Sequence, residues 1–80
     1  MQKLGICFRR PSDITEFVDL MNQCEYDVDL MSGRKIVDAK SLLGVIAISK
    51  ADEIELVIHG EECQEIMDKI QEYSRDRKIA

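Results

Sequence analysis

The sequence has few of the residues from which metal sites and disulfide frameworks are built. It contains a single histidine, and its three cysteines stand at unrelated spacings without a CxxC pair. An odd cysteine count argues against a disulfide framework, and one histidine leaves too few ligands for zinc. We expect no metal and no cofactor. Cys24 and Cys63 fall on apolar helical faces, so we expect them to be small core hydrophobes.

Long apolar runs and an excess of basic residues are also missing. No run approaches the roughly 20 apolar residues that span a bilayer, and the first residues lack the cleavage pattern of a signal peptide. The net charge is -5, whereas nucleic-acid binding needs clustered basic residues that release counterions from phosphates. We therefore expect a cytoplasmic protein that binds neither nucleic acid nor membranes.

No low-complexity tract and no linker rich in proline or glycine divides the 80 residues. A chain of this length buries only about 60 to 65% of its unfolded surface, so it supports one core and no large enclosed active site. We expect a single domain over residues 1–80.

Hydrophobic periodicity predicts the elements of this domain. Strands are indicated where apolar and polar residues alternate, and helices where apolar residues recur at i, i+3 and i+4. The expected elements are a strand over 3–8, a helix over 11–24, strands over 26–30 and 35–39 joined by a tight turn, a short helix over 42–47, a strand over 53–60 and a helix over 61–77. This β-α-β-β-α-β-α order predicts an α+β fold, in which helices cover one face of a four-stranded antiparallel sheet and the other face is open to water.

Two helix starts carry capping signals. Asp13 is followed three residues later by Glu16, which is suitable capping chemistry for the first helix. Ser41 is suited to be the N-cap of the short helix. The basic residues at positions 75, 77 and 78 suit the negative end of the last helix dipole.

The segment KSLLGVIAIS, residues 40–49, is apolar on almost every side. A short helix packed on a sheet cannot bury all of its large apolar side chains, and an exposed apolar patch on a small domain is typical of a docking surface. We expect Leu43 and Ile46 to point outward. The remaining large residues are expected to point inward: Leu42, Val45 and Ile48.

Other polar residues have a simpler interpretation. Asp27 and Asp29 predict a solvated sheet face, because nothing nearby in the sequence completes an oxygen cage for a metal ion. His59 comes at the end of the last strand, far from the first helix, and is expected to be a surface residue.

The element order and the stretch AKSLLGVIAIS, residues 39–49, resemble HPr, the histidine-containing phosphocarrier family of the bacterial phosphoenolpyruvate sugar phosphotransferase system. In that family the matching segment has lysine, a regulatory serine, two bulky apolar residues, glycine and valine. The resemblance implies an HPr-like open-faced β-sandwich with three helices on one face of the sheet. It also implies that Ser41 is a candidate for phosphorylation by a dedicated kinase. A ferredoxin-like βαββαβ domain is the alternative fold, but the extra segment at 41–48 favours HPr.

The stretch FRRPSDITEFV, residues 8–18, stands where the family keeps its phosphoryl-carrying histidine, in a loop of Gly, apolar, His, any residue, Arg and Pro. Counting back from the first helix without a gap places Arg10 at the histidine's position and Ser12 at the arginine's. Two extra residues instead align Arg10 and Pro11 with Arg-Pro and place Phe8 at the histidine. Phenylalanine has no nucleophile, and protonated arginine has no lone pair. We therefore expect no catalytic residue.

Three functions remain open. The first is a non-catalytic regulatory variant of HPr, not an enzyme, whose partner-binding surface contains four residues besides Ser41: Arg9, Arg10, Leu43 and Ile46. The second is a working phosphocarrier with an unidentified acceptor, and the third is an accessory domain without phosphorylation. By resemblance, the expected partners are phosphotransferase-system enzymes, HPr kinase or a transcriptional regulator, and we expect the protein to meet them as a monomer.

Overall fold

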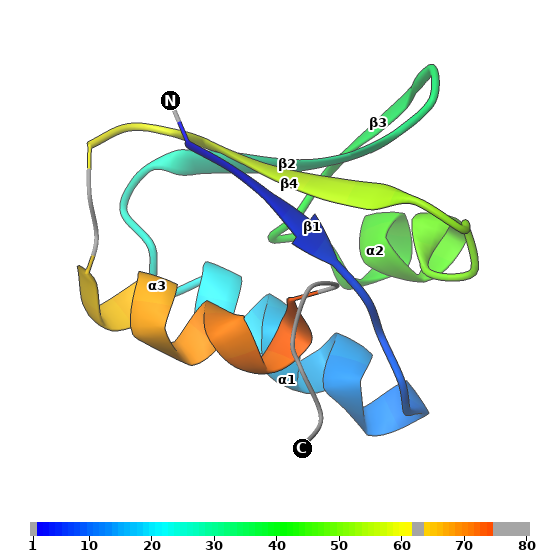
Figure 1. The fold of residues 1–80 in the computed structure, drawn as a ribbon, viewed down its shortest axis with the longest axis horizontal. Helices are drawn as coiled ribbons and strands as arrows, with labels where there is room; N and C mark the ends of the chain where they lie inside the picture. The colour runs from blue at the N-terminus through cyan, green and yellow to red at the C-terminus, as the bar shows by residue number, and fades with distance from the viewer. Residues whose placement is uncertain (1, 62–63, 75–80) are drawn as a thin grey trace.

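The computed structural model describes residues 2–61 and 64–74, which form a sheet with helices packed on one side (Figure 1). The elements are β1 (Gln2–Ile6), α1 (Pro11–Met21), β2 (Asp27–Ser32), β3 (Lys35–Asp38), α2 (Leu42–Ile48), β4 (Ile54–His59), α3 (Gln64–Ile70) and the 3-10 helix η1 (Gln71–Tyr73). The strands are antiparallel in the order β1-β4-β2-β3. The predicted α+β fold is confirmed. None of the helices in these residues has both the length and the apolarity to cross a bilayer.

The central strand β4 fixes which residues face the helices. Its register places Leu56 opposite Leu4 of β1 and Leu30 of β2. Residues that are paired across neighbouring strands point to the same face of the sheet. Leu30 and Leu56 share the face that the helices cover, and both are fully buried. Val57 points to the open face, between Lys3 and Asp29 in the register, and is nevertheless only 2% exposed. The open face is therefore not uniformly wet.

The core is centred on Phe17 of α1, which is fully buried. The ring of Phe8 meets it edge-on with centroids 5.2 Å apart, and the ring of Tyr73 does so at 5.7 Å. Cys24 is buried in the same core, as predicted, whereas Cys63 lies outside the described residues.

Three predicted elements extend too far. The first helix was predicted to residue 24, but α1 ends at Met21 and Asn22 is its C-cap. The first strand was predicted to residue 8, but β1 ends at Ile6, which frees Phe8 to pack on Phe17. The last helix was predicted to residue 77, but α3 ends at Ile70 and η1 at Tyr73. The reason is that Ser74 adopts an extended conformation and bridges to Ile6, so the chain leaves the helix to pair with β1. The basic residues at 75, 77 and 78 lie outside the described residues.

Gly60 lies directly against the ring of Tyr26. A Cβ at this position would come within 2.2 to 2.6 Å of three ring carbons. Gly60→Ala should therefore lower the free energy of unfolding by about 1–3 kcal/mol, because the ring or the strand end has to move. Urea denaturation measures this change. In a Tyr26→Ala background the same substitution should cost less, and an equal cost in both backgrounds would contradict the steric explanation.

Candidate functional site

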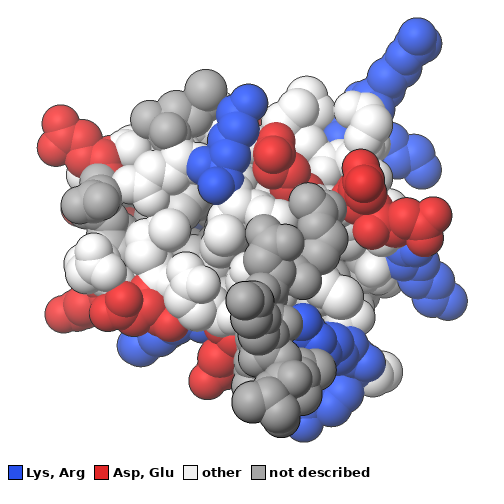
Figure 2. Space-filling view, viewed as in Figure 1, with Lys and Arg blue, Asp and Glu red and all other residues white. Residues whose placement is uncertain are grey.

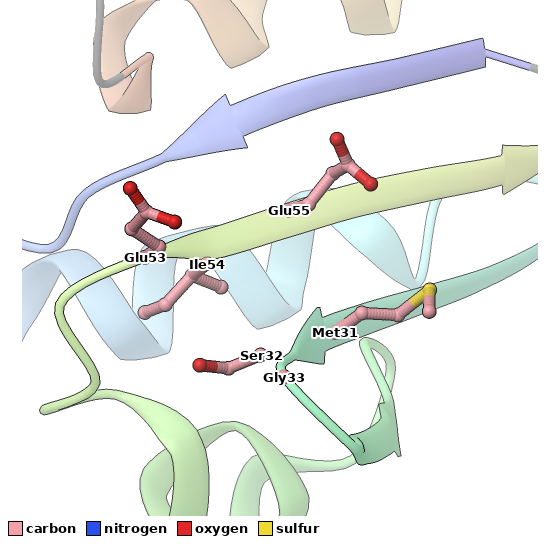
Figure 3. A pocket seen from close by; sticks show the side chains of 6 residues that line it. All are labelled: Met31, Ser32, Gly33, Glu53, Ile54 and Glu55. Carbon is pink, nitrogen blue, oxygen red and sulfur yellow. The ribbon is translucent and has the colours of Figure 1, made fainter.

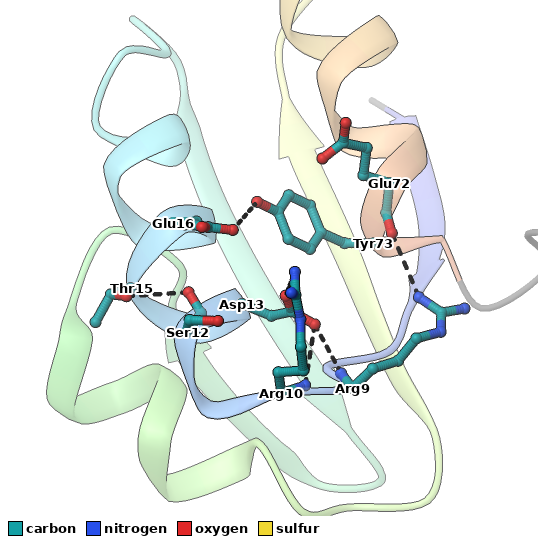
Figure 4. Close-up of polar contacts among 8 residues, drawn as sticks. All are labelled: Arg9, Arg10, Ser12, Asp13, Thr15, Glu16, Glu72 and Tyr73. Carbon is teal, nitrogen blue, oxygen red and sulfur yellow. Dashed lines mark hydrogen bonds and ion pairs between the residues drawn. The ribbon is translucent and has the colours of Figure 1, made fainter.

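The start of α1 holds a buried carboxylate (Figure 4). One oxygen of Asp13, Oδ2, accepts hydrogen bonds from the backbone N–H groups of Arg9 at 2.9 Å and Arg10 at 3.1 Å. The other oxygen accepts from the Arg10 guanidinium at 3.2 Å. The side chain of Asp13 is 8% exposed. Backbone amides at a helix start can bind anions, and here the protein's own carboxylate binds the N-cap amide of Arg10 and the preceding amide of Arg9.

The position of Pro11 explains why Asp13 takes this role. Pro11 is the first residue of α1 and Arg10 is the N-cap, since proline is preorganised for the first helical position. Asp13 is then the third helical residue and reaches back to the N-cap amide, as the acid of a capping box does. The predicted cap by Asp13 with Glu16 is therefore wrong. Glu16 instead accepts a hydrogen bond from the Tyr73 hydroxyl at 3.4 Å.

The pKa of Asp13 reflects these contacts. Burial raises this pKa, but hydrogen bonds from the Arg9 and Arg10 amides and from the Arg10 guanidinium outweigh burial and hold it below the usual 3.8. Because the pKa is depressed in the folded state, ionised Asp13 stabilises the fold at pH values above the pKa of the unfolded carboxyl. This stabilisation is lost as the pH falls through the folded pKa.

Asp13→Asn should lower the free energy of unfolding by about 1–2 kcal/mol at neutral pH, because an amide cannot replace both carboxylate oxygens as acceptors. The difference from the original protein should begin to shrink as the pH falls below about 4, where the carboxyl of the unfolded chain takes up a proton, and should shrink further as the pH falls through the depressed pKa of folded Asp13. Urea denaturation at pH 7 and at pH 3 measures both values. Asp19→Asn, at an exposed site on the same helix, is the control. A difference that does not change with pH would contradict the role of the carboxylate charge.

The two arginines of the loop have different surroundings. The Arg9 guanidinium donates to the backbone carbonyl oxygens of Glu72 at 3.3 Å and Ser74 at 3.2 Å, so it joins the loop to the segment after α3 (Figure 4). The side chain of Arg10 is 71% exposed and contacts Asp13. Both arginines are exposed, but the guanidinium of Arg9 is held by two backbone carbonyls whereas that of Arg10 contacts one side chain.

The start of α2 has the predicted cap. The hydroxyl oxygen of Ser41 accepts a hydrogen bond from the backbone N–H of Gly44 at 3.2 Å, which confirms Ser41 as the N-cap. The residue is exposed. Its hydroxyl is therefore at the surface, and α2 ends at Ile48, one residue beyond the predicted end.

The apolar residues of α2 divide between the core and the surface. Leu43 is 81% exposed and Ile46 49%, while Val45 and Ile48 are buried, as predicted. Leu42 was predicted to point inward, which is wrong, because it is 41% exposed. The buried face of α2 is that of Val45 and Ile48, and at about 100° of rotation per residue Leu42 lies at the edge of this face.

An open depression of about 340 Å³ lies between the start of α1 and α2. It is lined by Phe8, Arg9, Arg10, Pro11, Ile14, Ile46, Ser49 and Lys50. Apart from Ser49, every residue of this lining is apolar or basic, and none is acidic. Of the predicted partner-binding residues, the structure thus brings Arg9, Arg10 and Ile46 together, with Leu43 on the neighbouring surface of α2. The sequence prediction missed Phe8, Ile14 and Lys50, since only the packing of α1 beside α2 unites them with Ile46.

Four further depressions in the part of the chain that the structure describes each include acidic residues in their lining. A depression of about 210 Å³ beside the β2–β3 turn is lined in part by Glu53 and Glu55 and contains none of the predicted site residues (Figure 3). Acidic and basic side chains are interspersed over the face seen in Figure 2. His59 is exposed, as predicted, and its Nε2 lies 2.9 Å from Asp29. Within residues 2–61 and 64–74, no group of three histidine, cysteine or acidic residues is arranged to hold a metal ion.

Comparisons with known proteins point to one family. The family model described as "PTS HPr component phosphorylation site" matches residues 9–76. Among solved structures, HPr-C-His from Thermoanaerobacter tengcongensis has a TM-score of 0.72 at 18% identity, covering 90% of this chain and 89% of that one. HPr from Bacillus anthracis has a TM-score of 0.69 at 20% identity, covering 92% and 94%.

A third structure is the catabolite repression protein Crh of Bacillus subtilis, a dimer with a swapped domain. It has a TM-score of 0.61 at 29% identity, covering 84% of this chain and 78% of that one. No curated protein matches the sequence. The family model matches most of the chain, and the three solved structures share the fold of this protein. The chain therefore belongs to the HPr family of the phosphotransferase system.

Proposed function

We propose that this protein is a regulatory and interaction variant of HPr that carries no phosphoryl group on a histidine. The observation that supports this most strongly is the occupied start of α1. Asp13 accepts hydrogen bonds from the amides of Arg9 and Arg10, so an incoming phosphoryl group would meet a fixed negative charge at the start of the helix. The protein then regulates by binding, and it is not an enzyme.

The residues at the family's histidine position support the same proposal. A phosphoryl carrier needs a neutral imidazole lone pair as its nucleophile. Phe8 and Arg10, the two candidates for that position, offer none. The one histidine of the chain, His59, lies at the end of β4 beside Asp29 and does not line the depression between α1 and α2.

Ser41 is the proposed regulatory phosphorylation site. Its hydroxyl lies at the surface beside Lys40 and the exposed residues of α2. A phosphate there would add roughly -1.5 to -2 charge next to the apolar residues Leu43 and Ile46 and change which partners they bind. The similarity to the catabolite repression protein of Bacillus subtilis supports a regulatory role over a carrier role.

The proposed partner-binding surface consists of Arg9, Arg10, Leu43 and Ile46, together with the depression beside them. Its apolar centre and basic rim suit a protein partner that presents apolar side chains next to carboxylates. We propose that a cytoplasmic bacterial protein of the phosphotransferase system, HPr kinase or a transcriptional regulator binds there, and that this protein meets its partner as a monomer.

Two phosphorylation reactions test the proposal. The protein is incubated with phosphoenolpyruvate and the first enzyme of the phosphotransferase system, and separately with ATP and HPr kinase, and mass spectrometry locates any phosphate. We expect label on Ser41 in the second reaction alone. An acid-labile phosphate in the first reaction would instead identify a working phosphocarrier, and no label in either reaction would indicate an accessory domain.

The variants of Ser41 separate phosphorylation from capping. Ser41→Ala should lose the label and also about 1 kcal/mol of stability, because the N-cap acceptor is gone. Ser41→Asn should lose the label and keep the stability, because asparagine is an equally good N-cap. Label that persists in Ser41→Asn would contradict Ser41 as the site.

A further inference from the structure

The edge strand β3 presents an apolar side chain to solvent. It is the last strand in the sheet order β1-β4-β2-β3, and the turn of its hairpin with β2 projects away from α1 and α3 (Figure 1). Ile36 of β3 is 60% exposed and pairs with Met31 on β2. Exposed edge strands with apolar residues are templates for pairing with another strand.

The register of the hairpin shows which backbone groups of β3 face outward. The turn has two residues, Gly33 at φ 59 and Arg34, between the paired Ser32 and Lys35. Antiparallel pairs alternate between hydrogen-bonded and non-bonded, and the Ala39 N–H bonds to Val28 of β2. The backbone groups of residues 35, 37 and 39 therefore face β2, and those of Ile36 and Asp38 face the open edge. Of these, the Asp38 carbonyl accepts from the Ser41 N–H.

We propose that two copies of this protein pair antiparallel through β3, with Ile36 on the two-fold axis. In this register the Ile36 N–H of each copy donates to the Ile36 carbonyl of the other. The two isoleucine side chains then meet on the open face of the joined sheets. The contact is isologous, as a two-fold interface requires.

Charge complementarity selects this register over its neighbour. The segment is basic just before β3, with Arg34 in the turn, and acidic at the end of β3, with Asp38. With Ile36 on the axis, Arg34 of one copy lies opposite Asp38 of the other, twice. A shift that places Val37 on the axis would instead bring Arg34 opposite Lys40, where like charges repel.

The size of the contact sets the expected affinity. Pairing of two four-residue strands buries much less surface than the roughly 1,200 Å² of a stable interface. Each copy also carries a net charge of -5, so the two copies repel one another. We expect a dissociation constant on the order of 0.1–1 mM. The protein is then monomeric at low micromolar concentration, and the dimer leaves α2 free for partners. The inference is independent of the proposed function.

Sedimentation equilibrium from about 10 µM to about 1 mM tests this proposal. We expect a reversible monomer–dimer equilibrium in the original protein, no dimer for Ile36→Lys, and at least about 10-fold weaker association for Arg34→Glu. Circular dichroism should show that both variants, altered at exposed sites, remain folded. The matched control is Leu43→Lys, which makes the same apolar-to-lysine change on α2 and should leave the association unchanged.

Three outcomes would overturn the proposal. The protein could remain monomeric at about 1 mM, the dimer could survive Ile36→Lys, or Leu43→Lys could abolish it. A dimer that survives Ile36→Lys uses another contact, such as a swapped domain. Amide exchange of Ile36 gives a second readout, since its N–H should be protected only at high protein concentration.

Discussion

Replacing Leu43 and Ile46 together with serine should lower kcat/KM for phosphorylation of Ser41 by HPr kinase by roughly 30- to 1000-fold. This range corresponds to a loss of about 2–4 kcal/mol, which is usual for the central apolar residues of an interface. The two residues are 81% and 49% exposed, so they contribute little to the core and are accessible to a partner. The phosphorylated hydroxyl and its hydrogen bond to Gly44 are unchanged by the substitution.

The control for this prediction is Ile36→Ser. Ile36 is also exposed, at 60%, but it lies on β3 and outside the depression between α1 and α2. It should leave kcat/KM unchanged at micromolar concentration. Equal losses in both proteins, or no loss in the double variant, would show that the kinase docks elsewhere.

Phe17→Ala should lower the free energy of unfolding by about 3–5 kcal/mol. A domain of this size has a total stability of roughly 4 to 12 kcal/mol, so this one change should remove about a quarter or more of it. Phe17 is fully buried, and its removal leaves a cavity between the rings of Phe8 and Tyr73. Urea denaturation, or the fraction folded by circular dichroism, measures the loss.

Phe17→Leu is the matched control for the core. It keeps most of the apolar volume and should cost about 1.5 kcal/mol or less. A loss below about 1.5 kcal/mol for Phe17→Ala would mean that α1 can collapse into the cavity, and the ring cluster would then not be the centre of the core.

Local patterns were sufficient to predict most of the fold. The alternation around Leu56 and the helical spacing around Phe17 come from contacts that every strand or amphipathic helix makes, so the sequence alone contains them. Ser41 was predictable as an N-cap for the same reason, because its hydroxyl oxygen and the Gly44 N–H that donates to it lie three residues apart. The outward positions of Leu43 and Ile46 followed from the limited area that a short helix can bury.

The contacts that were missed connect distant parts of the chain. Arg9 bonds to carbonyl oxygens 63 and 65 residues away, and no local pattern encodes such a pair. The early end of the last helix has the same origin, because Ser74 leaves the helix to bridge to Ile6. Asp13 was predicted to cap the helix itself, but it is the third helical residue and reaches back to the N-cap amide of Arg10. The position of Pro11 at the start of the helix decides this.

The contact between the loop and the segment after α3 has a consequence for local opening. The Cys7 N–H donates to the Tyr73 carbonyl at 2.7 Å, next to the two carbonyls bound by Arg9. The Cys7 amide can exchange with deuterium only when residues 72–74 detach from the loop. Its exchange rate therefore measures the free energy of that detachment separately from global unfolding. A single amide thus reports how firmly the last described turn is held to the first loop of the chain.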